Sequence, residues 1–354
     1  MPRPIAWRSR IWFDLPVFEL KMKAGLLRRL KLKYLQIKIN LASACKGRQP
    51  FTKEQFLSDC ADNSLIIKAI QGAIKPGRFT IKIHDEPKPL ATVTKVPEQD
   101  YYFLEISQPA LLEPCFDFLT PKIETYFKRH ASSLDVERDL FHRMCMTCAS
   151  MMVYYHEAAH ILCGHLDYEE VKGELPIPDW TADPASFKPW FNAAVHPVLP
   201  IRTRELDADI HGAQFSLGHA MHACDAVAKV RRKTFLQAYT IGVRGLFEYL
   251  TWGAPHDTPA AAIEHPAPIT RAYVAITHAV ARMDEMGVSR DEIGQLQQFA
   301  LEVLLDFESR DLGLTVNADV LQTALATELE LWSRRHKEFA PFQPKSAKRK
   351  RAQQ

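Results

Sequence analysis

Residues Phe141–Gly164, FHRMCMTCASMMVYYHEAAHILCG, form one long and mostly apolar stretch that predicts a buried helix. Near its end stand His156, Glu157 and His160. Histidines four residues apart lie on one face of a helix, one turn apart, so both imidazoles can bind the same metal ion. Glu157 lies close enough to act on a water at the metal without being a ligand. Because such residues are costly in an apolar helix unless paired or metal-bound, a metal site is favoured over two structural histidines.

The remaining metal ligand is expected downstream of this helix. A catalytic zinc has three protein ligands and one open position. A motif with a third histidine close by would need Gly and His where this sequence has Cys163 and Leu166. In the segment RELDADIHGA, residues 204–213, Glu205 and Asp209 share one helix face. Glu205 can therefore bind the metal, while Asp209 accepts a hydrogen bond from a ligand histidine.

Two further features bear on this second segment. Ala208 and Gly212 are small, as close packing against the first helix would require. In isolation, the segment is typical of an acidic, solvated helix face. Downstream of the His156–His160 pair, the metal-site interpretation is favoured. His165 is expected at the end of the first helix, in support of a ligand, because a fourth ligand would close the metal to water.

The composition is typical of a folded globular protein: 354 residues, of which 47% are apolar and 25% are charged. The first third predicts a helix at 51–74 and strands at 79–84 and 101–107, with a proline-containing loop between the strands. Later patterns are helical, so the expected fold class is α+β and mainly helical. Helices are expected at 141–164, 203–223, 226–251 and 269–286, with two more before residue 340. The predicted divisions are a basic α+β segment at 1–110, a metal-binding core at 111–285, C-terminal helices at 286–340 and a disordered basic tail at 341–354.

Several features predict a soluble cytoplasmic protein. The longest apolar run, Met144–Tyr155, is too short to span a membrane, and we find no signal peptide. Seven cysteines are an odd and sparse set, which favours reduced thiols. Cys145 and Cys148 form a CxxC pair inside the apolar stretch, where core packing is favoured over redox or metal chemistry.

The HExxH sequence at 156–160, followed by Glu205-x-x-Ala208-Asp209, resembles the gluzincin metallopeptidases. It is most similar to the CAAX prenyl-protease type and its small soluble relatives, the minigluzincins. The stretch His265-Pro-Ala-Pro-Ile-Thr-Arg271 resembles their downstream His-Pro and Arg element. A looser likeness is to the phage-exclusion peptidases of bacteria. The resemblance covers about 150–275 and implies a zincin-like core with one zinc held by His156, His160 and Glu205.

The same resemblance implies an activity. Glu157 would be the general base for a water activated by zinc, and Asp209 would support the ligands. His265 is the preferred catalytic partner, and Arg271 and Tyr273 are further candidates to stabilise the transition state. The expected function is a soluble zinc-dependent endopeptidase that cleaves an intracellular protein substrate, without insertion into a membrane.

Other functions stay open at this point. A zinc hydrolase could act on a non-peptide amide. A nucleic-acid-binding or sensory protein could carry a structural metal. Its support is the basic ends: residues 1–50 have only Asp14 and Glu19 as acids, and the tail contains KSAKRKR at 345–351. A solvated basic face is favoured over nucleic-acid contact.

Overall fold

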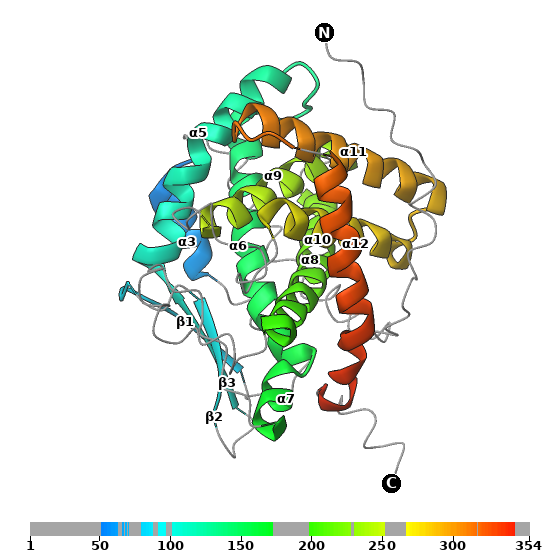
Figure 1. The fold of residues 1–354 in the computed structure, drawn as a ribbon. Coiled ribbons are helices and arrows are strands. Elements are labelled where there is room, and N and C mark those ends of the chain that lie inside the picture. The colour runs from blue at the N-terminus through cyan, green and yellow to red at the C-terminus, as the bar shows by residue number, and fades with distance from the viewer. Residues whose placement is uncertain are drawn as a thin grey trace.

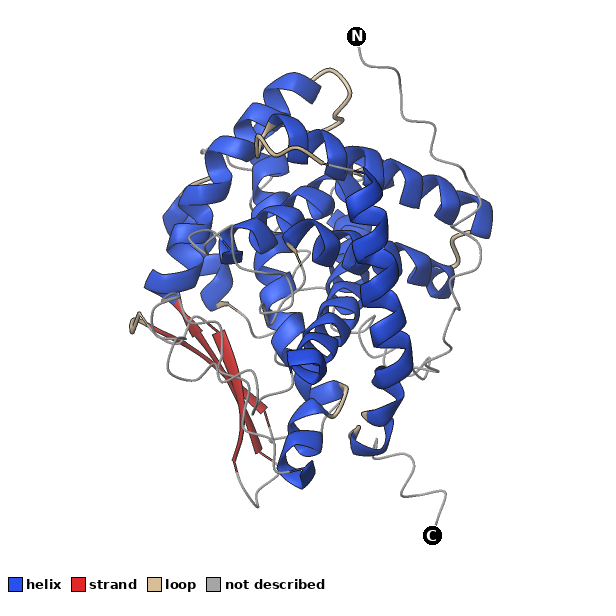
Figure 2. Cartoon of the chain, in the orientation of Figure 1, coloured by secondary structure: helices blue, strands red, loops and turns tan. Residues whose placement is uncertain are grey.

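The computed structural model describes residues 51–62, 79–87, 91–96, 101–172, 198–227, 230–251, 267–316 and 318–343, with Ile66, Lys68 and Ile70. Within these residues the chain forms a bundle of helices with a small sheet at one side (Figures 1 and 2). The expected α+β, mainly helical fold class is therefore confirmed.

Helix α6, Arg138–Leu162, runs through the middle of the bundle (Figure 1). From Met144 to Ile161 almost all of its side chains are buried, which explains why its sequence lacks a polar face. It packs on α8 and α9, and α10 packs on both of these helices. The helices around α6 are α3 (Lys53–Ala61), α5 (Glu113–His130), α7 (His165–Lys172), α8 (Val198–Val227), α9 (Arg232–Thr251), α10 (Pro268–Ala281), α11 (Arg290–Arg310) and α12 (Ala318–Arg335). Short helical turns occupy Gln108–Leu112, Arg282–Met286, His336–Glu338 and Ala340–Phe342.

The sheet has three strands, β1 (Phe79–His84), β2 (Ala91–Val96) and β3 (Tyr101–Ser107), in the order β1-β3-β2. β1 runs parallel to β3, and β2 runs antiparallel to it. The register places the buried side chains of Ile81, Leu104 and Val93 side by side. β2, at the edge of the sheet, also packs on α6.

Most of the elements expected from the sequence are present. β1 and β3 match their predictions, and Thr52 caps α3 by accepting a hydrogen bond from the backbone of Gln55. Helix α5 was expected only as part of a generally helical region, and two elements were missed altogether. The segment between β1 and β3, expected to be a loop, contains β2. Its sequence ATVTKV is rich in the β-branched residues Thr and Val, which favour strands. The prolines on both sides of it masked that signal. The short helix α7 follows α6 after a turn at Gly164, whose φ of 85° suits glycine.

One hydrophobic cluster extends from Phe56 in α3, through the sheet and α6, to Phe307 in α11. A smaller cluster joins α8, α10 and α12, where Leu206, Val274 and Trp332 pack together. The division of the chain at residues 110, 285 and 340 stays a prediction. Among the described residues, no helix is both long and apolar enough to cross a membrane.

Candidate metal centre

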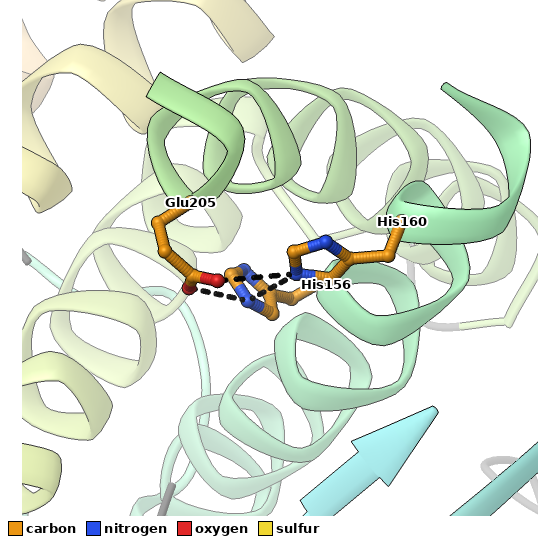
Figure 3. A group of neighbouring side chains, drawn as sticks. All are labelled: His156, His160 and Glu205. Carbon is orange, nitrogen blue, oxygen red and sulfur yellow. Dashed lines mark hydrogen bonds and ion pairs between the residues drawn. The ribbon is translucent and has the colours of Figure 1, made fainter. Parts of the chain in front are cut away.

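Two helices bring the predicted metal ligands together. His156 and His160 lie one turn apart near the end of α6 and Glu205 lies on α8, with all three side chains pointing toward one another (Figure 3). The helices approach closely because Gly212 has no side chain. A Cβ at this position would lie 2.8 Å from both the backbone nitrogen and the Cα of His156. Ala208 packs against α6 in the same contact, so the predicted close packing of the two helices is confirmed.

The spacing of the three donor groups fits a small divalent ion. His156 Nε2 lies 3.3 Å from Glu205 Oε2 and 3.3 Å from His160 Nε2. His160 Nε2 lies 3.6 Å from Glu205 Oε1. A tetrahedral zinc with bonds of about 2.0–2.1 Å holds neighbouring ligand atoms about 3.4 Å apart. All three side chains are buried, so these residues could hold a metal ion with little rearrangement.

His156 is oriented by a buried ion pair behind it. Its Nδ1 lies 2.9 Å from Oδ1 of Asp209, which is the contact predicted between Asp209 and a ligand histidine. Arg271 on α10 donates two hydrogen bonds to the same carboxylate, from Nε at 2.7 Å and from a terminal nitrogen at 2.8 Å. The guanidinium also lies 4.4 Å from the centre of the Phe247 ring. A hydrogen on Nδ1 of His156, donated to Asp209, leaves the Nε2 lone pair directed at the metal position.

The electrostatics of the two histidines differ. Burial lowers the pKa of His156, but the carboxylates of Asp209 and Glu205 outweigh burial and raise that pKa to about 10. A proton on Nε2, bonded to Glu205, therefore takes the position that a cation would take. Burial holds the pKa of His160 well below its ordinary value, because Glu205 compensates only in part. His160 is therefore neutral, as a metal ligand must be.

His160 is oriented by a second chain of hydrogen bonds, which the sequence did not predict in full. Its Nδ1 lies 3.0 Å from Nδ1 of His165, the first residue of α7. His165 Nε2 lies 3.0 Å from Oδ2 of Asp207 on α8. Trp332 on α12 donates its indole hydrogen to Oδ1 of the same carboxylate, with the two atoms 2.6 Å apart. His165 thus contacts a ligand, as expected, but Asp207 and Trp332 were missed.

Two more groups surround Asp207. Burial raises the pKa of the Cys163 thiol well above its ordinary value, and its hydrogen bond to Asp207 adds to the effect. Burial also opposes the ionisation of Asp207, but the charge of His211 and the hydrogen bond from His165 outweigh it and hold the pKa of Asp207 well below its usual range. Cys163, His165 and Asp207 are side chains of metal-binding types that lie together. They form hydrogen bonds with one another and with neighbouring residues, so we assign them to the support of His160.

Glu157 lies beside the ligand set and is 3% exposed. Burial opposes the charge on Arg271, yet the carboxylates of Asp209, Glu205 and Glu157 together raise the pKa of that guanidinium. The guanidinium of Arg271 therefore lies among three carboxylates. Glu157 is therefore a buried carboxylate next to the ligand His156 in the sequence and close enough to Arg271 to act on its charge.

The remaining candidates have different positions. Tyr273 lies on α10 two residues after Arg271 and packs, half-buried, against the small cluster that contains Trp332. Burial raises the pKa of its hydroxyl. His265 lies outside the described residues. A contact of Arg271, Tyr273 or His265 with substrate stays a prediction. The thiols of Cys145 and Cys148 are buried in the main cluster without a disulfide, as expected for core packing.

Comparisons with known proteins give no further guide to the site. No protein-family model matches the chain, and no curated protein or solved structure matches it. The assignment of the centre therefore depends on its own geometry and chemistry.

Proposed function

We propose that this chain is a zinc-dependent endopeptidase of the gluzincin type, with a zincin-like core and with His156, His160 and Glu205 as the metal ligands. The observation that carries the proposal is the convergence of their donor atoms, 3.3 to 3.6 Å apart, on one buried point. Two imidazoles and one carboxylate are a donor set typical of catalytic zinc.

A zinc ion at this point would supply a Lewis acid that polarises a carbonyl group and makes water acidic enough to react near neutral pH. Glu157 would serve as the general base for that water and as the proton donor to the leaving amine. Asp209 would hold the hydrogen of His156 on Nδ1 when a metal occupies Nε2, and Arg271 keeps Asp209 ionised and in place.

The geometry favours a catalytic over a structural metal. Structural zinc is almost always bound by four protein ligands, often cysteines. Among the described residues, one carboxylate and two histidines converge, which leaves a position for water or substrate.

The sheet supports a peptide as substrate. In the described part of the chain β2 pairs with β3 alone, and it lies against α6. Lys95 near the end of β2 forms an ion pair with Asp167 on α7, directly after the helix that carries the ligands. An extended peptide could pair with the outer edge of β2, which packs on the helix that carries the ligand histidines. A non-peptide amide has no such use for a strand edge.

The competing nucleic-acid hypothesis has less support. Its evidence is the basic composition of residues 1–50 and of the tail after Gln343, and both lie outside the described residues. Cytoplasmic location and an intracellular protein substrate remain parts of the proposal.

The test is hydrolysis of unstructured protein by the zinc-loaded full chain. Casein and a library of peptides from a cell digest would be incubated with the protein, and new termini would be identified by mass spectrometry. We expect cleavage by the wild type, and a loss of roughly 100-fold or more in Glu157→Gln, the usual effect of removing a general base. Glu302→Gln, at an exposed position of α11, is the matched control and should cleave like the wild type.

Zinc content separates the outcomes. Glu157→Gln should retain zinc, because Glu157 is not among the converging donors. If the zinc-loaded wild type cleaves nothing, or if Glu157→Gln cleaves as fast as Glu302→Gln, the proposed endopeptidase mechanism is wrong.

A further inference from the structure

The chain of contacts from His160 to α12 joins segments that are far apart in sequence. His160 ends the metal-binding face of α6, His165 begins α7, Asp207 lies on α8 and Trp332 lies near the end of α12. His165 and Asp207 are almost completely buried, and Trp332 is 5% exposed. The ring of Phe339 packs edge-on against His165, with ring centroids 4.7 Å apart. This series of hydrogen bonds is therefore fixed by buried side chains both at His165 and at Trp332.

The direction of the hydrogens in this chain follows from the metal. A neutral His160 that binds a metal through Nε2 must carry its hydrogen on Nδ1. That hydrogen points at Nδ1 of His165, 3.0 Å away, which must then accept it. His165 consequently carries its own hydrogen on Nε2, which needs an acceptor. Asp207 supplies one, because an ionised carboxylate only accepts hydrogen bonds.

Trp332 fixes the other side of Asp207. An indole nitrogen can only donate, so the oxygen that it faces must accept. A carboxylate satisfies both neighbours, with Oδ1 toward Trp332 and Oδ2 toward His165. The Cys163 thiol can donate or accept and so does not dictate the arrangement.

We infer that Asp207 and His165 are positioning residues that hold the metal ligand His160 in its metal-binding tautomer. We also infer that Trp332, which can only donate, requires an acceptor oxygen on its side of residue 207 and so determines which atom of an amide at that position would face His165. This inference depends on the metal site of the proposed function but not on peptidase activity. It predicts an unusual result, in which a second substitution that removes packing restores metal binding.

The substitution Asp207→Asn has one preferred arrangement while Trp332 is present. The amide oxygen must face the indole, so the amide NH2 faces His165. Nε2 of His165 must then accept, and its hydrogen moves to Nδ1 and is donated to His160. His160 in turn carries its hydrogen on Nε2, where the metal should bind. We expect zinc affinity to fall by about 10- to 100-fold, the usual effect of losing such a supporting contact.

Trp332→Phe frees the amide in the double variant. Its oxygen can turn to His165, and its NH2 can turn toward Nε2 of His211, which lies 3.6 Å from Oδ1 of Asp207. His211 Nδ1 is 3.2 Å from the side-chain oxygen of Gln214. Without the carboxylate of Asp207 to favour its charged form, a neutral His211 that donates from Nδ1 to Gln214 can accept through Nε2. We therefore expect the double variant to recover most of the lost affinity. Trp332→Phe alone keeps the carboxylate and should bind zinc within a few-fold of the wild type.

The experiment measures the Zn²⁺ dissociation constant of the four full-length proteins by competition with a chromophoric chelator. The visible spectrum of bound Co²⁺ reports whether the same ligands are used. The thermal unfolding midpoint of each metal-free protein is recorded beside it, since a merely structural role predicts that the double variant is both less stable and weaker in zinc binding than Asp207→Asn. The inference is overturned if Asp207→Asn binds zinc like the wild type, or if the folded double variant binds no better than Asp207→Asn. If the wild type itself binds no zinc, the proposed metal site fails instead.

Discussion

Gly212 offers a quantitative test of the contact between α6 and α8. In Gly212→Ala, the new Cβ would lie 2.8 Å from the backbone N and Cα of His156. Carbon atoms in contact prefer about 3.5 Å, so the two helices must separate by roughly 0.7 Å at this point. Metal–ligand distances tolerate only about 0.2 Å. The displacement should therefore weaken zinc binding by at least about tenfold, because Glu205 and His156 lie on opposite sides of the contact.

Gly218, on the same helix, provides the control. A Cβ at Gly218 would meet no atom within 4 Å. Both substitutions gain about 1 kcal/mol of helix propensity, so their difference isolates the cost of the clash. Overpacking of a core typically costs about 1–3 kcal/mol, and we expect metal-free Gly212→Ala to be less stable than Gly218→Ala by that amount. Urea unfolding and zinc competition measure the two effects. Equal stability and equal zinc affinity in the two variants would refute the close approach.

Two further predictions concern buried ionisable groups. Asp209→Ala should lower the free energy of unfolding by about 3–5 kcal/mol, since it leaves the buried guanidinium of Arg271 without its main partner. Urea unfolding measures this loss, and a loss of less than about 1 kcal/mol would contradict the prediction. Burial lowers the pKa of His142 from 6.5 to about 4, so the native state keeps this residue neutral while the unfolded chain is protonated below about pH 6.5. The free energy of unfolding is therefore expected to fall by up to about 3 kcal/mol as the pH falls from 6.5 to 4, and that of His142→Gln should fall less over the same range. If the wild type and His142→Gln lose stability equally between these pH values, the lowered pKa of His142 is contradicted.

The parts of the site that the sequence predicted are those set by helical periodicity. His156 with His160, and Glu205 with Asp209, are each four residues apart, so each pair had to share a face once its helix formed. The need for small residues at the helix contact also followed from the pattern, and Gly212 lies there. Local spacing therefore identified the residues that converge at the candidate centre.

The parts that were missed depend on tertiary contacts. Nothing in the sequence near Trp332 shows that its indole hydrogen bonds to Asp207, which is 125 residues earlier. In the sequence Asp207 is one acid among several on a helix face, and only its contacts with His165 and Trp332 in the folded chain reveal its role. β2 was a different case, because its β-branched residues were visible in ATVTKV and were outweighed by the neighbouring prolines.

The arginine on α10 illustrates a third case. Arg271 was expected near the site on the resemblance to gluzincins. The structure places its guanidinium on Asp209, fully buried, where it supports a ligand histidine through a carboxylate. Sequence spacing could not separate this role from contact with substrate, since Asp209 and Arg271 lie 62 residues apart.

Metal content is the most direct test of the account. Elemental analysis would be made on purified wild type, Glu205→Ala and Glu157→Gln, each with its far-ultraviolet circular dichroism to confirm folding. The geometry predicts about one zinc per chain in the wild type and in Glu157→Gln, and little or none in Glu205→Ala, because Glu205 supplies one of the three converging donors. A wild type without metal, or a folded Glu205→Ala that retains a full equivalent of zinc, would contradict the assignment of the centre.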